Sequence, residues 1–257
     1  MSRWKLAAVI TMLGASAARA DDVGFQVETS VASSYIYRGI VQYSTRRAPS
    51  SQSTAAVRLD HLGPGSLTLT AWNATALADF SQQPGNAVEL DLSATYTGAD
   101  GPLAYSAGYA AYLYPNHADG APLDGAHELF GTVAYTNDYI VPTAGIYLEP
   151  IRQQGVYVMV AGTHDFHAGG WTLSPTISLG AATYRKYLGG DQSAGPHLND
   201  ATAALAARYG FAGGVYAVAR VSYALRGTPS ELVPMAMDWS FDGRSSIFGA
   251  LAVGVAR

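Results

Sequence analysis

The residues with the clearest chemical potential are the tyrosines and arginines of one short stretch, "SSYIYRGIVQYSTRR" at 33–47. The stretch carries three tyrosines and three arginines around a single glycine. Interleaved Tyr and Arg side chains can stack on nucleobases and hold phosphates, so these residues alone are compatible with a nucleic-acid or anion site. The charge of the whole chain, and the elements that position these side chains, must decide whether they form one.

A second group of reactive residues is the segment "THDFH", in which His164 and His167 flank Asp165. Histidine and aspartate are metal ligands, but here they come at the end of an apolar stretch that runs into a glycine-rich turn, where side chains need not converge. We therefore interpret the segment as a polar turn and predict no metal and no cofactor. The chain has no G-x-S-x-G motif and no conspicuous His and Ser pair, so we also predict that it is not an enzyme.

The N-terminus predicts export. It has two early basic residues, an apolar run over 6–13 and small residues that end in Ala-Arg-Ala at 18–20, which is the layout of a secretory signal peptide. We expect 1–20 to be cleaved and 21–257 to form a single domain, without disulfides or a lipid-modified cysteine because the sequence has no cysteine. Cleavage removes three basic residues and changes the formal net charge from -4 to -7. Such an acidic chain is a poor candidate for binding nucleic acid.

The composition narrows the fold class. Charged residues make up only 13% of the chain, and tyrosine occurs 17 times. No later segment offers the roughly 20 uninterrupted apolar residues that a membrane helix requires. A weakly charged exported chain rich in Tyr, Gly and Ala is typical of a transmembrane β-barrel, with a soluble β-sandwich or barrel as the main rival.

Alternation with a period of two favours the membrane barrel. In "AVELDLSATYTG", Leu90 and Leu92 fall on one face, and Glu89 and Asp91 fall on the other. Two carboxylates cannot face lipid, so this face must meet water, which in a membrane barrel is the lumen. The same alternation recurs in "PLAYSAGYAAYLY", "GGVYAVARVSYAL" and "SIFGALAVGVA". It predicts that the following charged residues line the lumen: Glu28, Arg38, Arg58, Asp60, Glu89, Asp91, Arg208 and Arg220.

The whole chain then divides into about twelve strands joined by connections that alternate in length. Short turns on one side and longer loops on the other are typical of an up-and-down antiparallel outer-membrane barrel, with the turns periplasmic and the loops extracellular. A Greek-key sandwich gives no reason for this sorting. The predicted strands are 23–39, 52–62, 65–77, 87–97, 102–114, 126–136, 139–149, 155–165, 170–183, 200–210, 213–225 and 245–256.

The mixed signs of the lumenal charges allow two interpretations. Ion pairs across a narrow interior would hold the shape of the barrel and fill it. A constriction lined by the same groups would instead filter solutes by charge. The width of a twelve-stranded barrel does not decide between them, because it exceeds that of the filled eight-stranded kind and falls short of the large porins.

The first strand and its loop also resemble a known family. The residues Ser33, Tyr35, Tyr37, Arg38, Gly39 and Ile40 match a Ser-x-Tyr-x-(Phe/Tyr)-Arg-Gly-(Ile/Leu) signature. This signature is similar to that of the TorF-type porins of Gram-negative bacteria, outer-membrane barrels that are often labelled conserved hypothetical proteins. The strand "AVELDLSATYTG" also resembles a later strand of that family, whereas the final Arg257 departs from the aromatic residue that usually ends such barrels. The resemblance implies an outer-membrane location and a passive pore, and names no substrate.

Together these patterns predict a passive outer-membrane channel for small polar solutes. Its partners would be the lipid of the outer membrane, the barrel-assembly machinery and the solutes themselves. The alternative is a non-conducting barrel with a structural role or with long loops that bind a partner. In either case Tyr35 and Tyr37 are expected in the outward aromatic girdle, Arg38 in the lumen near its mouth, and Arg46 and Arg47 on the first external loop.

Overall fold

The computed structural model describes residues 22–38, 40–41, 49–77, 88–114, 125–151, 155–183, 197–227 and 241–257. The predicted signal peptide, 1–20, lies outside these ranges, as do Gly39, Arg46 and Arg47. Over the described ranges, no helix is long and apolar enough to cross a membrane.

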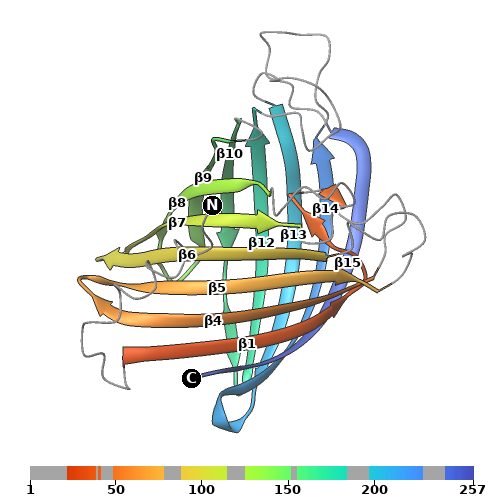
Figure 1. Cartoon of the computed structure of the whole chain (residues 1–257). Coiled ribbons are helices and arrows are strands. Elements are labelled where there is room, and N and C mark those ends of the chain that lie inside the picture. The colour runs from red at the N-terminus through yellow and green to blue at the C-terminus, as the bar shows by residue number, and fades with distance from the viewer. Residues whose placement is uncertain are drawn as a thin grey trace, which may run out of the picture.

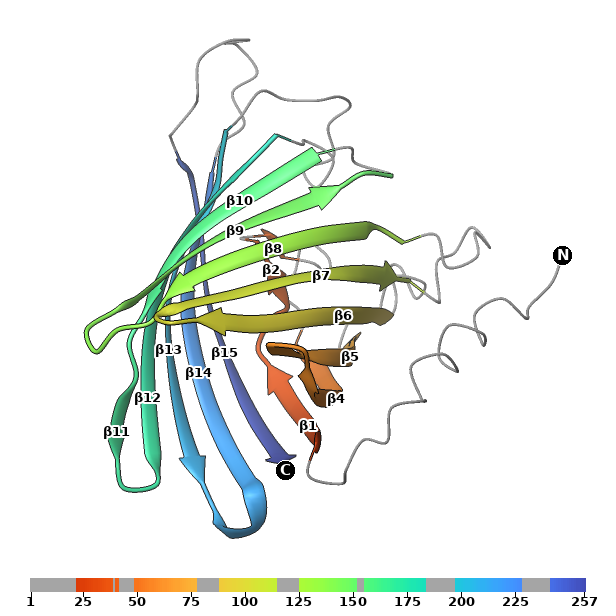
Figure 2. The same cartoon turned by 90° about the vertical axis from the view of Figure 1, so that its left-hand side faces the viewer.

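The described residues form a closed antiparallel barrel of twelve strands, as the alternation predicts (Figures 1 and 2). Each strand pairs with its neighbours along the chain, and the ring closes where the first and last strands pair. Phe25 and Arg257 exchange backbone hydrogen bonds of 2.8 and 2.9 Å, so the pairing extends to the final residue. The wall strands are β1 (Val23–Ala32), β4 (Ser50–Leu62), β5 (Gly65–Ala76), β6 (Val88–Asp100), β7 (Leu103–Leu113), β8 (His127–Tyr135), β9 (Val141–Glu149), β10 (Gly155–Thr163), β12 (Trp171–Ala182), β13 (His197–Gly210), β14 (Val215–Gly227) and β15 (Phe241–Ala256).

Short turns gather at one end of the barrel, which is also the end where β1 begins and β15 ends. Gly63 and Gly101 supply the positive φ angles, 67° and 56°, that tight turns between strands require. In the turn between β8 and β9, the Asn137 side chain accepts hydrogen bonds from two backbone N–H groups, those of Tyr139 and Ile140. We call this the lower end, and it corresponds to the periplasmic side of outer-membrane barrels. The longer connections leave from the opposite, upper end.

The two faces of the wall differ as the alternation predicts. Large apolar side chains such as Val27, Leu92 and Leu251 are exposed on the outside, and Leu251 exposes 70% of its surface. In a bilayer these side chains face lipid, while each described wall strand is paired with a neighbour on both sides. Inward positions such as Tyr216 and Ala252 are buried against each other.

The first predicted strand, 23–39, is wrong beyond Ala32. The wall strand β1 ends there, and the chain turns into the lumen to form a small hairpin of β2 (Ile36–Tyr37) and β3 (Ile40–Val41), which lies inside the ring in Figure 2. Ser33 is the last residue paired with the wall, through its N–H and the Gly249 carbonyl. We call residues 33–41 the inner segment.

Tyr35 and Tyr37 therefore do not belong to an outward girdle. Tyr35 is 8% exposed, and its ring lies 5.1 Å from that of Trp72 on the inner face of β5. The Tyr37 hydroxyl is 2.9 Å from that of Tyr112 on β7. The prediction for residues 33–39 was wrong because the side chains of an inward hairpin alternate with the same period of two as those of a strand that continues in the wall.

Candidate lumen site

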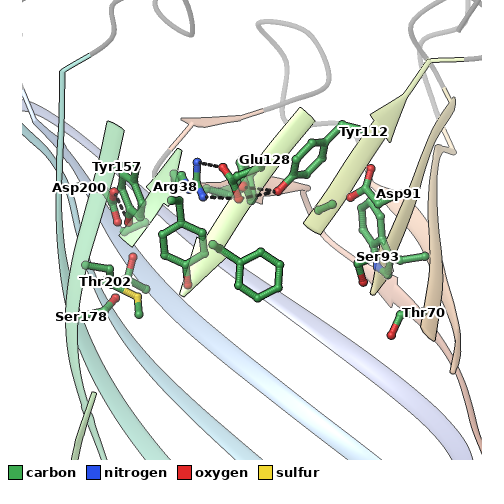
Figure 3. Close-up of a pocket in the computed structure, with 18 of the residues that line it drawn as sticks. Arg38, Thr70, Asp91, Ser93, Tyr112, Glu128, Tyr157, Ser178, Asp200 and Thr202 are labelled. Carbon is green, nitrogen blue, oxygen red and sulfur yellow. Dashed lines mark hydrogen bonds and ion pairs between the residues drawn. The ribbon is translucent and has the colours of Figure 1, made fainter. Parts of the chain in front are cut away.

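A cavity of about 520 Å³ occupies the upper half of the lumen. The inner segment supplies one side of it, and wall strands from β5 round to β15 supply the rest (Figure 3). Its polar residues come from positions near the upper ends of their strands, such as Asp91 on β6, Glu128 on β8 and Asp200 on β13. We call this space the upper cavity.

Arg38 is the central basic group of the upper cavity. Its guanidinium makes two contacts with the Glu128 carboxylate, Nη1 to Oε2 at 2.8 Å and Nη2 to Oε1 at 3.0 Å. The side chains of Arg38 and Glu128 are only 9% and 5% exposed. Two parallel contacts of this kind fix the orientation of the guanidinium as well as its position. The prediction that Arg38 points into the lumen near its mouth agrees with this placement.

Three tyrosine rings surround the same guanidinium. Arg38 Cζ lies 4.7 Å from the ring centres of Tyr37 and Tyr147 and 4.1 Å from that of Tyr157. The faces of aromatic rings are electron-rich and stabilise a cation that has lost its water. These three rings and the Glu128 carboxylate form what we call the guanidinium cage.

The backbone of Arg38 is also constrained. Its φ angle is 48°, in the left-handed region that residues other than glycine rarely adopt. The Asn199 side chain on β13 donates a hydrogen bond of 3.0 Å to the Arg38 carbonyl. Contacts to the wall therefore hold both the backbone and the side chain of Arg38 in this conformation.

The carboxylates around the cage have different surroundings. Glu128 accepts a further hydrogen bond from the Tyr112 hydroxyl, at 3.1 Å. Asp200 accepts hydrogen bonds from Tyr157 and Asn199. In the view of Figure 3, Asp200 and Asp91 lie on opposite sides of the Arg38 and Glu128 pair. The Oδ1 atom of Asp91 is buried and accepts no hydrogen bond from the described residues.

Glu89 lies two residues before Asp91 on the inner face of β6, but it does not line the upper cavity. It is 4% exposed and accepts a hydrogen bond of 3.4 Å from the Tyr114 hydroxyl. The pair of carboxylates predicted from "AVELDLSATYTG" therefore divides into a buried group, Glu89, and a cavity-lining group, Asp91.

A cavity of about 480 Å³, which we call the lower cavity, lies nearer the lower end. It contains Glu28, Arg208 and Arg220 from the predicted set. Arg220 on β14 forms an ion pair with Glu28 on β1, with 3.0 Å between Nη1 and Oε1. The Arg208 guanidinium lies 4.3 Å from the centre of the Tyr216 ring. The ion pair of Arg220 and Glu28 is more exposed than the pair of Arg38 and Glu128 in the upper cavity.

Arg58 and Asp60 lie in neither the upper nor the lower cavity. They pair with each other along β4 at 2.7 Å, and the Arg58 side chain is 60% exposed. Within the described ranges, no group of three or more His, Cys, Asp or Glu residues could hold a metal ion. In the segment "THDFH", the His164 ring packs against Phe166, and His167 Nδ1 is 3.1 Å from the Thr172 hydroxyl.

Most of the upper cavity was not identified from sequence. The cage residues Glu128, Tyr147 and Tyr157 and the nearby Asp200 lie on predicted strands, and the alternation there carried the necessary signal. Leu129 and Leu148, for example, are outward neighbours of Glu128 and Tyr147. What sequence could not supply was the position of the inner segment that brings Arg38 to them.

Comparison with protein families finds one that matches about half of this chain. The family model described as "Bacterial protein of unknown function (Gcw_chp)" matches residues 16–141. No curated protein matches the sequence. This family match covers the region of the TorF-type resemblance without naming that group, so membership of the TorF-type porins stays a prediction.

Solved structures similar to this chain include two porins and an outer membrane channel. A structure described as KdgM porin has a TM-score of 0.52 at 8% identity, and one of NanC porin has 0.51 at 11%; each alignment covers 90% of this chain and 98% of the other. An outer membrane channel from Pseudomonas putida F1 gives 0.51 at 8% identity, over 92% of this chain and 96% of its own. At these identities the likeness concerns the fold alone, which is that of an outer-membrane β-barrel.

Proposed function

We propose that the protein is a passive channel of the bacterial outer membrane for small polar solutes. The observation that carries this proposal is the pair of cavities of about 520 and 480 Å³, one in each half of the lumen and each lined in part by charged side chains. Solutes would move down their gradient through these spaces, with no chemical step and no cofactor. Outer-membrane lipid would surround the exposed apolar band, and the barrel-assembly machinery would insert it.

The inner segment narrows the proposed path from the extracellular side. It places Tyr35, Tyr37 and Arg38 within the lumen, where a continuous wall strand would have left open space. The path would therefore admit only small solutes while the segment is in this position. The acidic groups of the upper cavity would also disfavour anions. One KdgM structure is described in complex with disordered oligogalacturonate, a polyanion, and we expect this chain to exclude such a solute.

The same inner segment favours a second candidate function. A segment held to the wall by a buried ion pair and by the rings of Tyr147 and Tyr157 could close the lumen completely. The barrel would then serve the envelope structurally or bind a partner through its long loops. The difference between these functions is whether solutes cross.

Swelling of proteoliposomes separates the two functions. Vesicles containing the refolded barrel are diluted into isotonic solutions of neutral solutes of graded size, from glycerol to disaccharides. A channel narrowed by the inner segment should give swelling that falls steeply with solute size. Vesicles that swell no faster than protein-free ones in every solute, with the barrel shown to be folded by its strand circular dichroism, would support the non-conducting role.

A further inference from the structure

The guanidinium cage is already occupied by a cation, and that cation belongs to the chain itself. Arg38 reaches the cage from the inner segment, whereas Tyr147, Tyr157 and Glu128 are fixed on wall strands. Contacts among wall residues also hold the wall side of the cage. The ring centres of Tyr147 and Tyr157 are 5.7 Å apart, and the Tyr157 hydroxyl donates a hydrogen bond to Asp200. A guanidinium from another molecule would find the same three groups.

The upper cavity also has free space beside Arg38 in which the rest of a ligand could lie. A volume of about 520 Å³ falls within the range of small-molecule sites. Trp72, Phe130 and Tyr112 supply aromatic surface for an apolar chain, and Asp91 supplies a carboxylate oxygen that accepts no hydrogen bond from the described residues. Among the described residues that line this cavity, Arg38 is the only base, against the three carboxylates Asp91, Glu128 and Asp200.

We propose that the upper cavity binds small organic cations that carry a guanidinium group on a short alkyl chain, and that Arg38 is the internal occupant with which they compete. The guanidinium of the solute takes the place of Arg38 between the Tyr147 and Tyr157 rings and pairs with Glu128. Its alkyl chain lies along the aromatic surface toward Asp91. Binding itself requires only the folded barrel, while its consequence for transport rests on the proposed channel function.

The chemistry of the cage distinguishes this class of solute from others. Anions meet three carboxylates and no base except one that is already paired with Glu128. A neutral sugar that displaced Arg38 could stack on the rings. It would, however, leave the buried Glu128 carboxylate without the cation that now compensates its charge. A planar guanidinium satisfies both the two oxygen atoms of the carboxylate and the ring faces.

The test is direct binding to the refolded, detergent-solubilised barrel by isothermal titration calorimetry, with n-butylguanidinium as the probe. Its neutral isostere n-butylurea is the matched control ligand, because it has the same shape without the charge. We expect the cation to bind at least about tenfold more tightly than the urea. Glu128→Gln should weaken binding of the cation several-fold, because it removes the carboxylate that pairs with the guanidinium. Glu28→Gln, which changes a carboxylate in the lower cavity, should not alter it.

Arg38→Ala provides the sharpest variant, because removing a competitor should increase the affinity for n-butylguanidinium. Equal affinities for the cation and the urea, or no binding of either to the folded wild-type barrel, would overturn the proposal whether or not Arg38→Ala folds. Binding with no detectable conductance in bilayers would support the site and count against the channel. Conductance without preferential binding of the cation would support the channel and overturn this site.

Discussion

Replacing Arg38 with glutamine should release the inner segment from the wall while the barrel stays folded. The substitution removes the charge that faces Glu128 and the cation that three tyrosine rings surround. The hydrogen bonds between wall strands do not involve this side chain. Losing the contacts of Arg38 should therefore weaken the docking of the inner segment much more than it lowers the stability of the barrel.

The size of the effect follows from the burial of the pair. Removing one partner of a buried ion pair costs about 3 to 5 kcal/mol, because the other charge stays buried without compensation. We take the lower limit, since Glu128 keeps its hydrogen bond from Tyr112. About 3 kcal/mol corresponds to a roughly hundredfold increase in the undocked fraction of the inner segment.

Thiol labelling measures this fraction. The sequence has no cysteine, and Ser34 is a buried residue of the inner segment whose hydroxyl makes no hydrogen bond to the described residues, so Ser34→Cys gives one reporter at small structural cost. In this background, Arg38→Gln should raise the rate of labelling by a membrane-impermeant maleimide about a hundredfold, provided that the segment redocks faster than the thiol reacts. Arg208→Gln is the control, because that arginine also lies over a tyrosine ring but in the lower cavity. Equal labelling rates in both variants would refute the claim that Arg38 holds the segment.

Three further predictions concern the wall and the upper cavity. Asp91→Asn should lower the preference for cations over anions by at most about fourfold, which is the effect of one full charge roughly 5 Å from a hydrated ion. The buried Glu89→Gln should change this preference less. Reversal potentials in asymmetric salt would show the difference, and equal shifts would contradict it. Leu251→Arg, on the outer face near the middle of its strand, should lower the free energy of unfolding in lipid vesicles by about 2 to 4 kcal/mol. Val255→Arg, near the membrane surface, should lower it by at most about 1 kcal/mol. Equal losses for the two variants in urea titrations would argue against this placement in the bilayer. Gly180→Ala should destabilise the folded barrel by about 1 to 3 kcal/mol in the same assay, because the added methyl group would overlap the Tyr157 hydroxyl; an unchanged urea midpoint would show that Tyr157 can move at no cost.

The wall of the barrel could be predicted from sequence because its signal is local. A period of two assigns each side chain to lipid or lumen from its immediate neighbours, and Leu92 and Asp91 on β6 follow it. The short turns carry their own signals in glycine and asparagine. Strand ends were less accurate: β15 begins at Phe241, where the sequence pattern predicted a start at 245.

The upper cavity could not be predicted in the same way, because its central contact joins residues far apart in the chain. Arg38 and Glu128 are separated by 90 positions, and no local pattern specifies that they meet. Tyr35 and Tyr37 have the spacing of girdle residues, yet they serve an inward hairpin. Only the closed ring, which places β8, β9 and β10 opposite the inner segment, makes Glu128, Tyr147 and Tyr157 available to Arg38.

The proposed channel function is tested most directly by single-channel recording from the refolded barrel in a planar bilayer. We predict discrete conductance steps with a preference for cations, and larger or more frequent openings when Arg38→Gln loosens the inner segment. The absence of steps from both wild type and Arg38→Gln, with the barrel shown to be folded in the same lipid, would contradict the channel and leave the non-conducting barrel as the function.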